Sequence, residues 1–153
     1  MLIRVATLDD AEDACAVMRR SIAELCHADH RDDPAILARW LANKTPETFL
    51  GWTQQRDNNL LVAVEDGHIL AVGSVTDDGG IGLNYVSPDA RFRGVSRAML
   101  GALEQRAAER GNVECILTST ETARQFYLSR GYMEVGAPVR EFGMTGYPMR
   151  KKL

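Results

Sequence analysis

Arginine residues gather around a glycine between a predicted strand and a predicted helix: Arg91, Arg93, Gly94 and Arg97. Apolar and small residues at helical spacing indicate that the helix runs from Val95 to about Arg110. A helix N-terminus leaves backbone N–H groups without partners and carries partial positive charge. Arginine adds forked donors, and glycine allows a ligand to approach the backbone. This combination is typical of a phosphate or pyrophosphate site, but a solvated basic loop has the same composition.

The segment Arg93-Gly94-Val95-Ser96-Arg97-Ala98 resembles the acetyl-CoA pyrophosphate loop of the GNAT (Gcn5-related N-acetyltransferase) family, Arg/Gln-x-x-Gly-x-Gly/Ala. In this register Arg93 takes the first position, Ala98 the last, and Ser96 replaces the central glycine. Val86-Ser87-Pro88 resembles the Val-x-Pro that usually precedes the loop. The resemblance implies cofactor contacts from Val86, Arg91, Arg93, Gly94, Val95, Ser96, Arg97 and Ala98.

A second signature of the same family, Asn-x-x-Ala-x-x-Phe-Tyr-x-x-x-Gly-Phe, resembles the stretch from Thr120 to Tyr132. Five positions match in register: Ala123, Phe126, Tyr127, Gly131 and Tyr132. Thr120 replaces the asparagine that touches the pantetheine arm, and its hydroxyl can still donate one hydrogen bond. The resemblance implies that Tyr127 contacts the cofactor and is the general acid, since a phenol with a pKa of about 10 keeps its proton at neutral pH.

The chemistry implied by the resemblance is direct transfer of an acetyl group from acetyl-CoA to a primary amine of a small molecule or peptide. The Val86 N–H is the candidate for polarising the thioester carbonyl. The general base stays open among a water chain and five residues: Glu24, His27, Asp29, His30 and Tyr85. The departures at Ser96 and Thr120 keep an alternative open, a non-catalytic acyl-CoA-binding sensor or regulatory module with the same fold.

Residues that could contact the amine acceptor lie in the N-terminal half and next to Val86: His27, Trp40, Trp52 and Tyr85. The aromatic residues among them could equally pack the helices on the sheet. The stretch from His27 to Asp33 is predicted to be a polar loop. Its histidines and aspartates match no metal-ligand spacing, so no metal is expected. Its acidic residues suggest contact with a polar or cationic substrate.

Composition is that of an ordinary folded domain, with 45% hydrophobic and 25% charged residues, and we expect one domain over residues 1–153. A net charge of −3 gives no basic field for nucleic acid. Neither a signal peptide nor a membrane-length apolar run is visible, and Cys15, Cys26 and Cys115 indicate reduced, buried thiols. We therefore expect a cytoplasmic protein without a membrane partner, and the resemblance adds homodimerisation as an expectation.

The element order predicts an α/β (α+β) fold with a mixed, mostly antiparallel central sheet and helices on both faces, as in GNAT acyltransferases. Asp33-Pro34 and Thr45-Pro46 each predict a capped helix start, and Asp66-Gly67 predicts a hairpin turn. The strand from Glu114 to Thr118 should pair in parallel with the strand that ends at Val86. A final turn is expected between Gly143 and Gly146.

Overall fold

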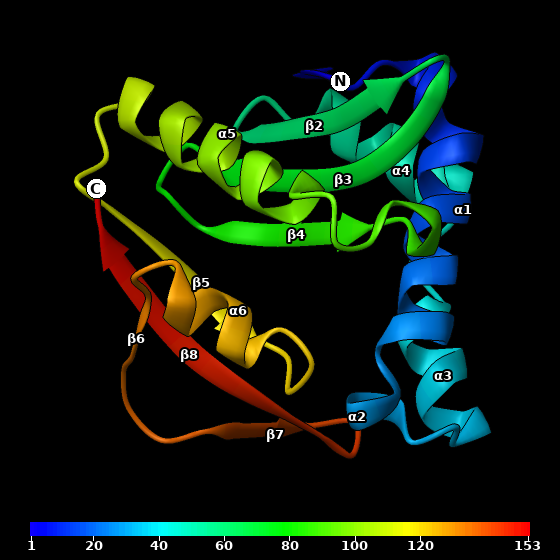
Figure 1. Cartoon of the computed structure of the whole chain (residues 1–153), viewed down its shortest axis with the longest axis vertical. Coiled ribbons are helices and arrows are strands. Elements are labelled where there is room, and N and C mark those ends of the chain that lie inside the picture. The colour runs from blue at the N-terminus through cyan, green and yellow to red at the C-terminus, as the bar shows by residue number, and fades with distance from the viewer.

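The computed structural model describes residues 1–153 and is shown in Figure 1. Its strands are β1 (Leu2–Val5), β2 (Asn58–Glu65), β3 (His68–Thr76), β4 (Ile81–Val86), β5 (Glu114–Ser119), β6 (Met133–Glu134), β7 (Val139–Glu141) and β8 (Met144–Lys152). Its α-helices are α1 (Ala11–Leu25), α2 (His27–His30), α3 (Pro34–Leu41), α4 (Pro46–Gln54), α5 (Val95–Glu109) and α6 (Arg124–Ser129). None of them combines the length and the apolar character that a membrane span requires.

The expected α/β architecture with mostly antiparallel strands is confirmed, but the strands form two sheets. The first sheet has the order β1-β2-β3-β4, and the second has the order β5-β8-β6 with β7 paired to β8. The predicted parallel pairing of β4 with β5 is limited to one bridge between Gly80 and Ile116. Beyond that bridge the two strands diverge, and Figure 1 shows them as the two sides of a wedge.

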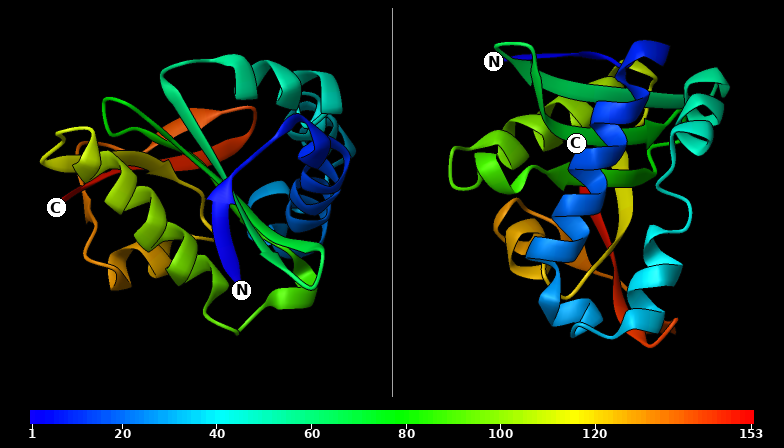
Figure 2. Two further views of the ribbon diagram at one scale, coloured as in Figure 1. Left: turned by 90° about the horizontal axis from the view of Figure 1, so that it is seen from above. Right: turned by 90° about the vertical axis from the view of Figure 1, so that its right-hand side faces the viewer.

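Helices cover both faces of the first sheet, as expected. α5 packs across β2, β3 and β4 on one face, and α1 and α4 cover the other face (Figures 1 and 2). Met99 and Leu103 of α5 are fully buried against the sheet. A Cβ atom at Gly73 of β3 would lie 2.7 Å from the Sδ atom of Met99. Glycine therefore allows α5 to lie directly on the backbone of β3.

The predicted helix starts and hairpin are confirmed. The Asp33 carboxylate accepts hydrogen bonds from the N–H groups of Ala35 and Ile36 at the start of α3. The Thr45 hydroxyl accepts from the Thr48 N–H at the start of α4. Between β2 and β3, Asp66 and Gly67 have φ values of 51° and 77°, as a type I′ turn requires.

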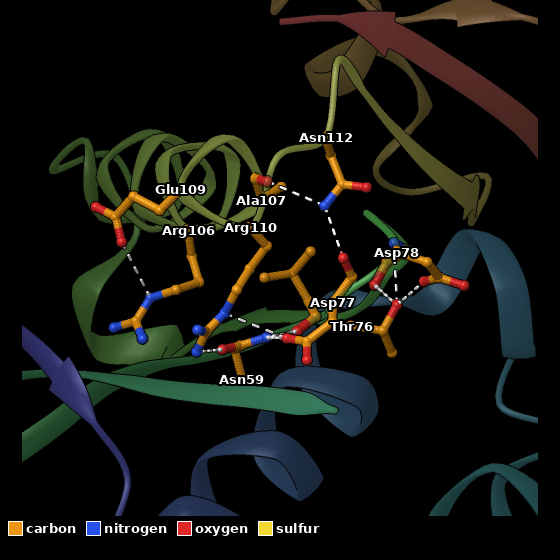
Figure 3. Close-up of polar contacts among 11 residues, drawn as sticks. Asn59, Thr76, Asp77, Asp78, Arg106, Ala107, Glu109, Arg110 and Asn112 are labelled. Atoms are coloured by element: carbon orange, nitrogen blue, oxygen red, sulfur yellow. Dashed lines mark hydrogen bonds and ion pairs between the residues drawn. The ribbon is translucent and has the colours of Figure 1, made fainter. Parts of the chain in front are cut away.

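A polar network fastens the C-terminal end of α5 to the first sheet (Figure 3). The Asn59 side chain of β2 donates to the Asp77 carboxylate at 3.0 Å and accepts from Arg110 at 3.0 Å. Arg110 also forms an ion pair with Asp77, while Asn112 donates to the carbonyls of Asp77 and Ala107. Because this end of α5 is fixed, its opposite end, the N-terminus, is held beside the end of β4.

Two sequence-based expectations about local structure are wrong. The stretch from His27 to Asp33, predicted to be a loop, begins with the short helix α2. The final turn lies at Phe142 and Gly143, both with positive φ, and Gly146 belongs to β8. A Cβ atom at Gly146 would lie 2.7 Å from the Cγ2 atom of Thr118 on β5, so this glycine serves the close approach of the two strands.

Candidate active site

The wedge between β4 and β5 opens into a pocket that brings together most of the residues predicted to contact the cofactor. Its closed end is held by the Ile116 N–H, which donates to the Gly79 carbonyl at 3.0 Å. Beyond it lies a pocket of about 450 Å³, lined by β4, β5, the segment from Ala90 to Arg97 and the start of α6. Most of its lining residues on β4 and β5 are apolar, so the pocket suits a long, partly apolar ligand arm.

The backbone of β4 directs hydrogen-bonding groups into this wedge. The Ser87 N–H donates to the Leu70 carbonyl of the neighbouring β3 strand at 2.7 Å. Because the direction of backbone groups alternates along a strand, the N–H groups of Val86 and Asn84 point away from β3 and toward β5. Since β5 has diverged there, these donors face the pocket. The edge of β4 can therefore pair with an extended ligand.

The N-terminus of α5 lies at one mouth of the pocket. Gly94 has a φ of 77°, and the first helical hydrogen bond runs from the Ala98 N–H to the Gly94 carbonyl at 3.0 Å. The N–H groups of Val95, Ser96 and Arg97 have no acceptor in the protein. The side chains of Arg91 and Arg97 line the same pocket, and neither has an acidic partner. Free donors, the helix dipole and two unpaired cations together form an anion site.

Tyr127 of α6 also lines the pocket. Its side chain is buried, and its hydroxyl oxygen accepts a hydrogen bond from the Asn84 amide at 3.3 Å. Burial raises the pKa of Tyr127, and the Asn84 hydrogen bond lowers it by a smaller amount. The phenol therefore keeps its proton at neutral pH and is placed to donate it into the wedge.

Comparison with known proteins decides the family. A family model described as "Acetyltransferase (GNAT) domain" matches residues 28–153, which is most of the chain. The chain belongs to the GNAT family.

Solved structures agree with this assignment. A GCN5-related N-acetyltransferase from Rhodopseudomonas palustris superposes with a TM-score of 0.87 at 24% identity, covering 99% of this chain and 95% of that one. The PaiA N-acetyltransferase from Thermoplasma acidophilum, solved with coenzyme A, gives 0.86 at 18% identity over 99% and 98%. A ribosomal-protein-alanine N-acetyltransferase from Brucella melitensis gives 0.73 at 23% identity over the full length of both. At these identities the likeness establishes the fold. No curated protein sequence matches the chain.

The structure favours a different register of the GNAT pyrophosphate loop. Arg93 points away from the pocket and pairs with Glu65, which lowers the pKa of the Glu65 carboxyl. Gly94, with its positive φ, has the conformation that requires glycine, whereas Ser96 is helical. In the favoured register the motif begins at Arg91 and has Gly94 at its centre, with Ser96 in the last position. In this register the central glycine is retained, and Ala98 lies inside the helix, outside the pocket lining.

Thr120 lines the pocket beside Tyr127 but has a structural role as well. Its hydroxyl oxygen accepts a hydrogen bond from the Ala123 N–H at 3.2 Å, immediately before α6. The hydroxyl hydrogen is left free to donate to a ligand. Thr120 therefore helps to form the turn that leads into α6, and it retains one donor toward the wedge.

The Asp29 side chain of α2 holds the segment that precedes α6. Its buried carboxylate accepts hydrogen bonds from the N–H groups of Glu121 and Thr122, at 2.8 and 3.2 Å, and from the Thr122 hydroxyl. All of these partners are internal, so Asp29 does not face a ligand and is no longer a candidate base. The acidic segment expected to contact a cationic substrate is in part a structural clamp.

Replacing Asp29 with alanine should lower the free energy of unfolding by about 2 to 4 kcal/mol, since two backbone N–H groups and the Thr122 hydroxyl lose their acceptor. Asp32 is the matched control, because its carboxylate is exposed and contacts only His27 and His30. Asp32→Ala should change the same quantity by less than about 1 kcal/mol. Chemical denaturation of both variants measures the difference, and equal losses would contradict the clamp.

His27, His30 and Asp32 bring ligand atoms within 4.8 Å of one another. The His30 ring is fully buried, however, and both of its nitrogens are occupied. Nε2 lies 2.9 Å from the Ile22 carbonyl, and Nδ1 accepts from the Asp32 N–H at 3.0 Å. His30 thus has no free lone pair for a metal or for a proton from substrate. The cluster is a hydrogen-bonded cap on α2, and His30 leaves the set of candidate bases.

Of the residues predicted to contact the amine acceptor, only Tyr85 lines the pocket. Its hydroxyl accepts a hydrogen bond from the Trp40 indole at 3.1 Å, and burial raises its pKa, so it keeps its proton at neutral pH. Trp52 packs beside Phe49 with ring centroids 6.4 Å apart, and His27 is exposed next to Asp32. Neither tryptophan lines the pocket, and Trp52 packs against the hydrophobic core, the packing role that was the alternative for the aromatic residues.

The three cysteines are free and buried, as expected. Cys26 lines the pocket, where burial raises its pKa to about 12 and its thiol donates to the Ser21 carbonyl at 3.7 Å. A thiol held in its protonated form is a poor nucleophile. Cys26 is therefore not a candidate nucleophile.

Proposed function

We propose that this GNAT domain transfers an acetyl group from acetyl-CoA directly to a primary amine of a small molecule or peptide. The observation that carries the proposal is one pocket with an anion site at one mouth and a buried, protonated phenol inside. Coenzyme A presents a pyrophosphate, an extended pantetheine arm and a sulfur atom in that order. The solved relative from Thermoplasma acidophilum contains coenzyme A, which supports the same ligand here.

The cofactor would lie along the wedge with its pyrophosphate on the N-terminus of α5. Arg91, Arg97 and the free N–H groups of the first turn receive the phosphates. The pantetheine arm then runs beside β4, where the Val86 N–H is directed at it. Because the Tyr127 hydroxyl contacts the side chain of Asn84, the thioester sulfur would come to lie beside residue 84. The Asn84 N–H therefore joins that of Val86 as a candidate for polarising the thioester carbonyl.

Transfer would begin with attack of the neutral amine nitrogen on the thioester carbonyl carbon. A carbon–nitrogen bond forms, the carbonyl oxygen gains negative charge, and the backbone N–H of β4 stabilises it. When the intermediate collapses, the carbon–sulfur bond breaks and the thiolate takes the phenolic proton of Tyr127. The amine loses its proton to water, since Asp29, His30 and Tyr85 are each occupied or protonated. The other two candidate bases lie outside the pocket lining: Glu24 pairs with Arg20, and His27 contacts Asp32.

The acceptor amine is constrained by the charge of the pocket. None of the residues that line it is acidic, and its two arginines, Arg91 and Arg97, are assigned to the cofactor phosphates. A site for a polyamine or another polycation needs carboxylates, so this lining favours an acceptor with a single amine. Amino acids, peptide N-termini and simple primary amines are therefore the first classes to test.

Calorimetric titration with acetyl-CoA, followed by a thiol-release assay over a panel of amines, tests the proposal. We expect binding of acetyl-CoA and release of coenzyme A with at least one monoamine. Binding without release across the panel would identify an acyl-CoA-binding module in place of an enzyme. Absence of binding would overturn both functions.

A further inference from the structure

The side-chain amide of Asn84 is only half satisfied. Its Nδ2 atom donates to the Tyr127 hydroxyl, and its Oδ1 atom is the one buried side-chain nitrogen or oxygen in the protein without a hydrogen-bond partner. A buried carbonyl without a donor lowers the stability of the folded state. Asn84 lies in the middle of β4, between residues that face the pocket or the core. Stability alone therefore does not account for an asparagine at this position.

Asn59 shows what a fully satisfied buried asparagine looks like in the same sheet (Figure 3). Its Nδ2 atom donates to the Val75 carbonyl and the Asp77 carboxylate, and its Oδ1 atom accepts from Arg110. Every hydrogen-bonding group of Asn59 thus contributes to the fold. The contrast gives a matched pair of residues: one asparagine is fully used by the structure, and the other contacts only the candidate acid.

The direction of the Asn84 contact determines where the phenolic proton can go. Because the amide N–H occupies a lone pair of the Tyr127 oxygen, the hydroxyl hydrogen has to point elsewhere. Tyr127 has no other side-chain or backbone partner for that hydrogen, and the pocket lies beside it. The amide therefore leaves the phenol with its hydrogen free for the wedge.

We propose that Asn84 is a positioning residue for the acid step: its amide N–H fixes the Tyr127 hydroxyl so that the phenolic hydrogen is directed at the leaving thiolate. The proposal rests on the proposed function, because it assigns the proton of Tyr127 to the sulfur of coenzyme A. The reaction itself is unchanged, and the backbone N–H of residue 84 keeps its role whatever the side chain. The unpaired Oδ1 is then a stability cost of this placement.

The first test compares Asn84→Leu with Asn59→Leu in thermal unfolding and acetyl transfer. Asn84→Leu removes the unpaired carbonyl at similar volume, so its Tm should equal or exceed that of the unchanged protein, while kcat falls about 10-fold. Affinity for coenzyme A should change by less than about 2-fold, since the backbone donors remain. Asn59→Leu should lower Tm by about 5 °C or more and leave kcat per folded molecule unchanged. A large loss of Tm in Asn84→Leu would make Asn84 a structural residue and overturn the proposal.

The second test needs no turnover, so it separates this proposal from the proposed function. A fluorinated tyrosine at position 127, titrated by fluorine NMR, reports the pKa of that phenol directly. An N–H that donates to the phenolic oxygen stabilises the phenolate, so Asn84→Leu should raise the pKa of Tyr127 measurably. A decrease would mean that the phenol donates to Asn84, and no change would mean no contact; either result overturns the positioning role. Asn84→Asp, of the same shape, should also raise the pKa and lower kcat.

Discussion

Replacing Tyr127 with phenylalanine should lower the rate of acetyl transfer about 100-fold, the lower range of what a general acid contributes. Phenylalanine keeps the ring that packs between Phe126 and Tyr132 and removes only the hydroxyl. The thiolate would then take its proton from water, which no group holds in place. Since the backbone of β4 and the N-terminus of α5 are untouched, the affinity for acetyl-CoA should stay within a few-fold. The measurement is thiol release under saturating cofactor.

The pH profile separates a lost acid from a general disturbance of the pocket. Burial raises the pKa of Tyr127, so the unchanged protein should keep its acid through the neutral range and lose it on the alkaline side, whereas the fall in rate toward acid pH follows protonation of the acceptor amine. That alkaline decline should be missing in Tyr127→Phe. Tyr132→Phe is the control, because it removes a buried hydroxyl that donates to Glu104 and lies outside the pocket. If Tyr127→Phe and Tyr132→Phe have equal transfer rates, the acid role is wrong.

Local signals in the sequence predicted most of the elements that carry the site. Proline after a capping residue marked the starts of α3 and α4, because the cap and the proline each act within one helical turn. The match of Ala123, Tyr127 and Gly131 to a single signature identified Tyr127 as the candidate acid. Backbone conformation was harder to predict: two registers of the pyrophosphate motif are compatible with the same letters. The φ of Gly94 and the pairing of Arg93 with Glu65 distinguish them.

The sequence could not predict contacts between residues that are far apart along the chain. Asp29 accepts hydrogen bonds from residues more than 90 positions away, so no local pattern shows that it is a clamp and not a substrate contact. The division into two sheets depends on Gly79 and Ile116, which hold β4 and β5 together at one point only. Asn84 did leave a signal, a polar residue in the apolar run Ile81–Val86, but its partner became visible only in the fold.

The second large effect concerns the anion site: Arg91→Ala should weaken acetyl-CoA binding about 10- to 100-fold, the contribution of a charge-assisted hydrogen bond. Arg91 and Arg97 line the pocket without acidic partners, so their charge is available to phosphate. Isothermal titration at several salt concentrations measures the loss. The salt dependence of binding should also become weaker, because one cation fewer faces the ligand.

Arg93→Ala is the matched control, a change of the same type two residues away. Arg93 is held by Glu65 on the side of the loop that faces away from the pocket, so its removal should weaken acetyl-CoA binding less than about 3-fold. Glu65→Ala extends the comparison, since it frees Arg93 without removing it. If Arg93→Ala weakens binding as much as Arg91→Ala, then Arg93 leaves Glu65 when the cofactor binds, and the motif begins at Arg93. If only Arg91→Ala weakens binding, the register with Gly94 at its centre is correct, and Ser96 is a last-position substitution in an otherwise complete pyrophosphate loop.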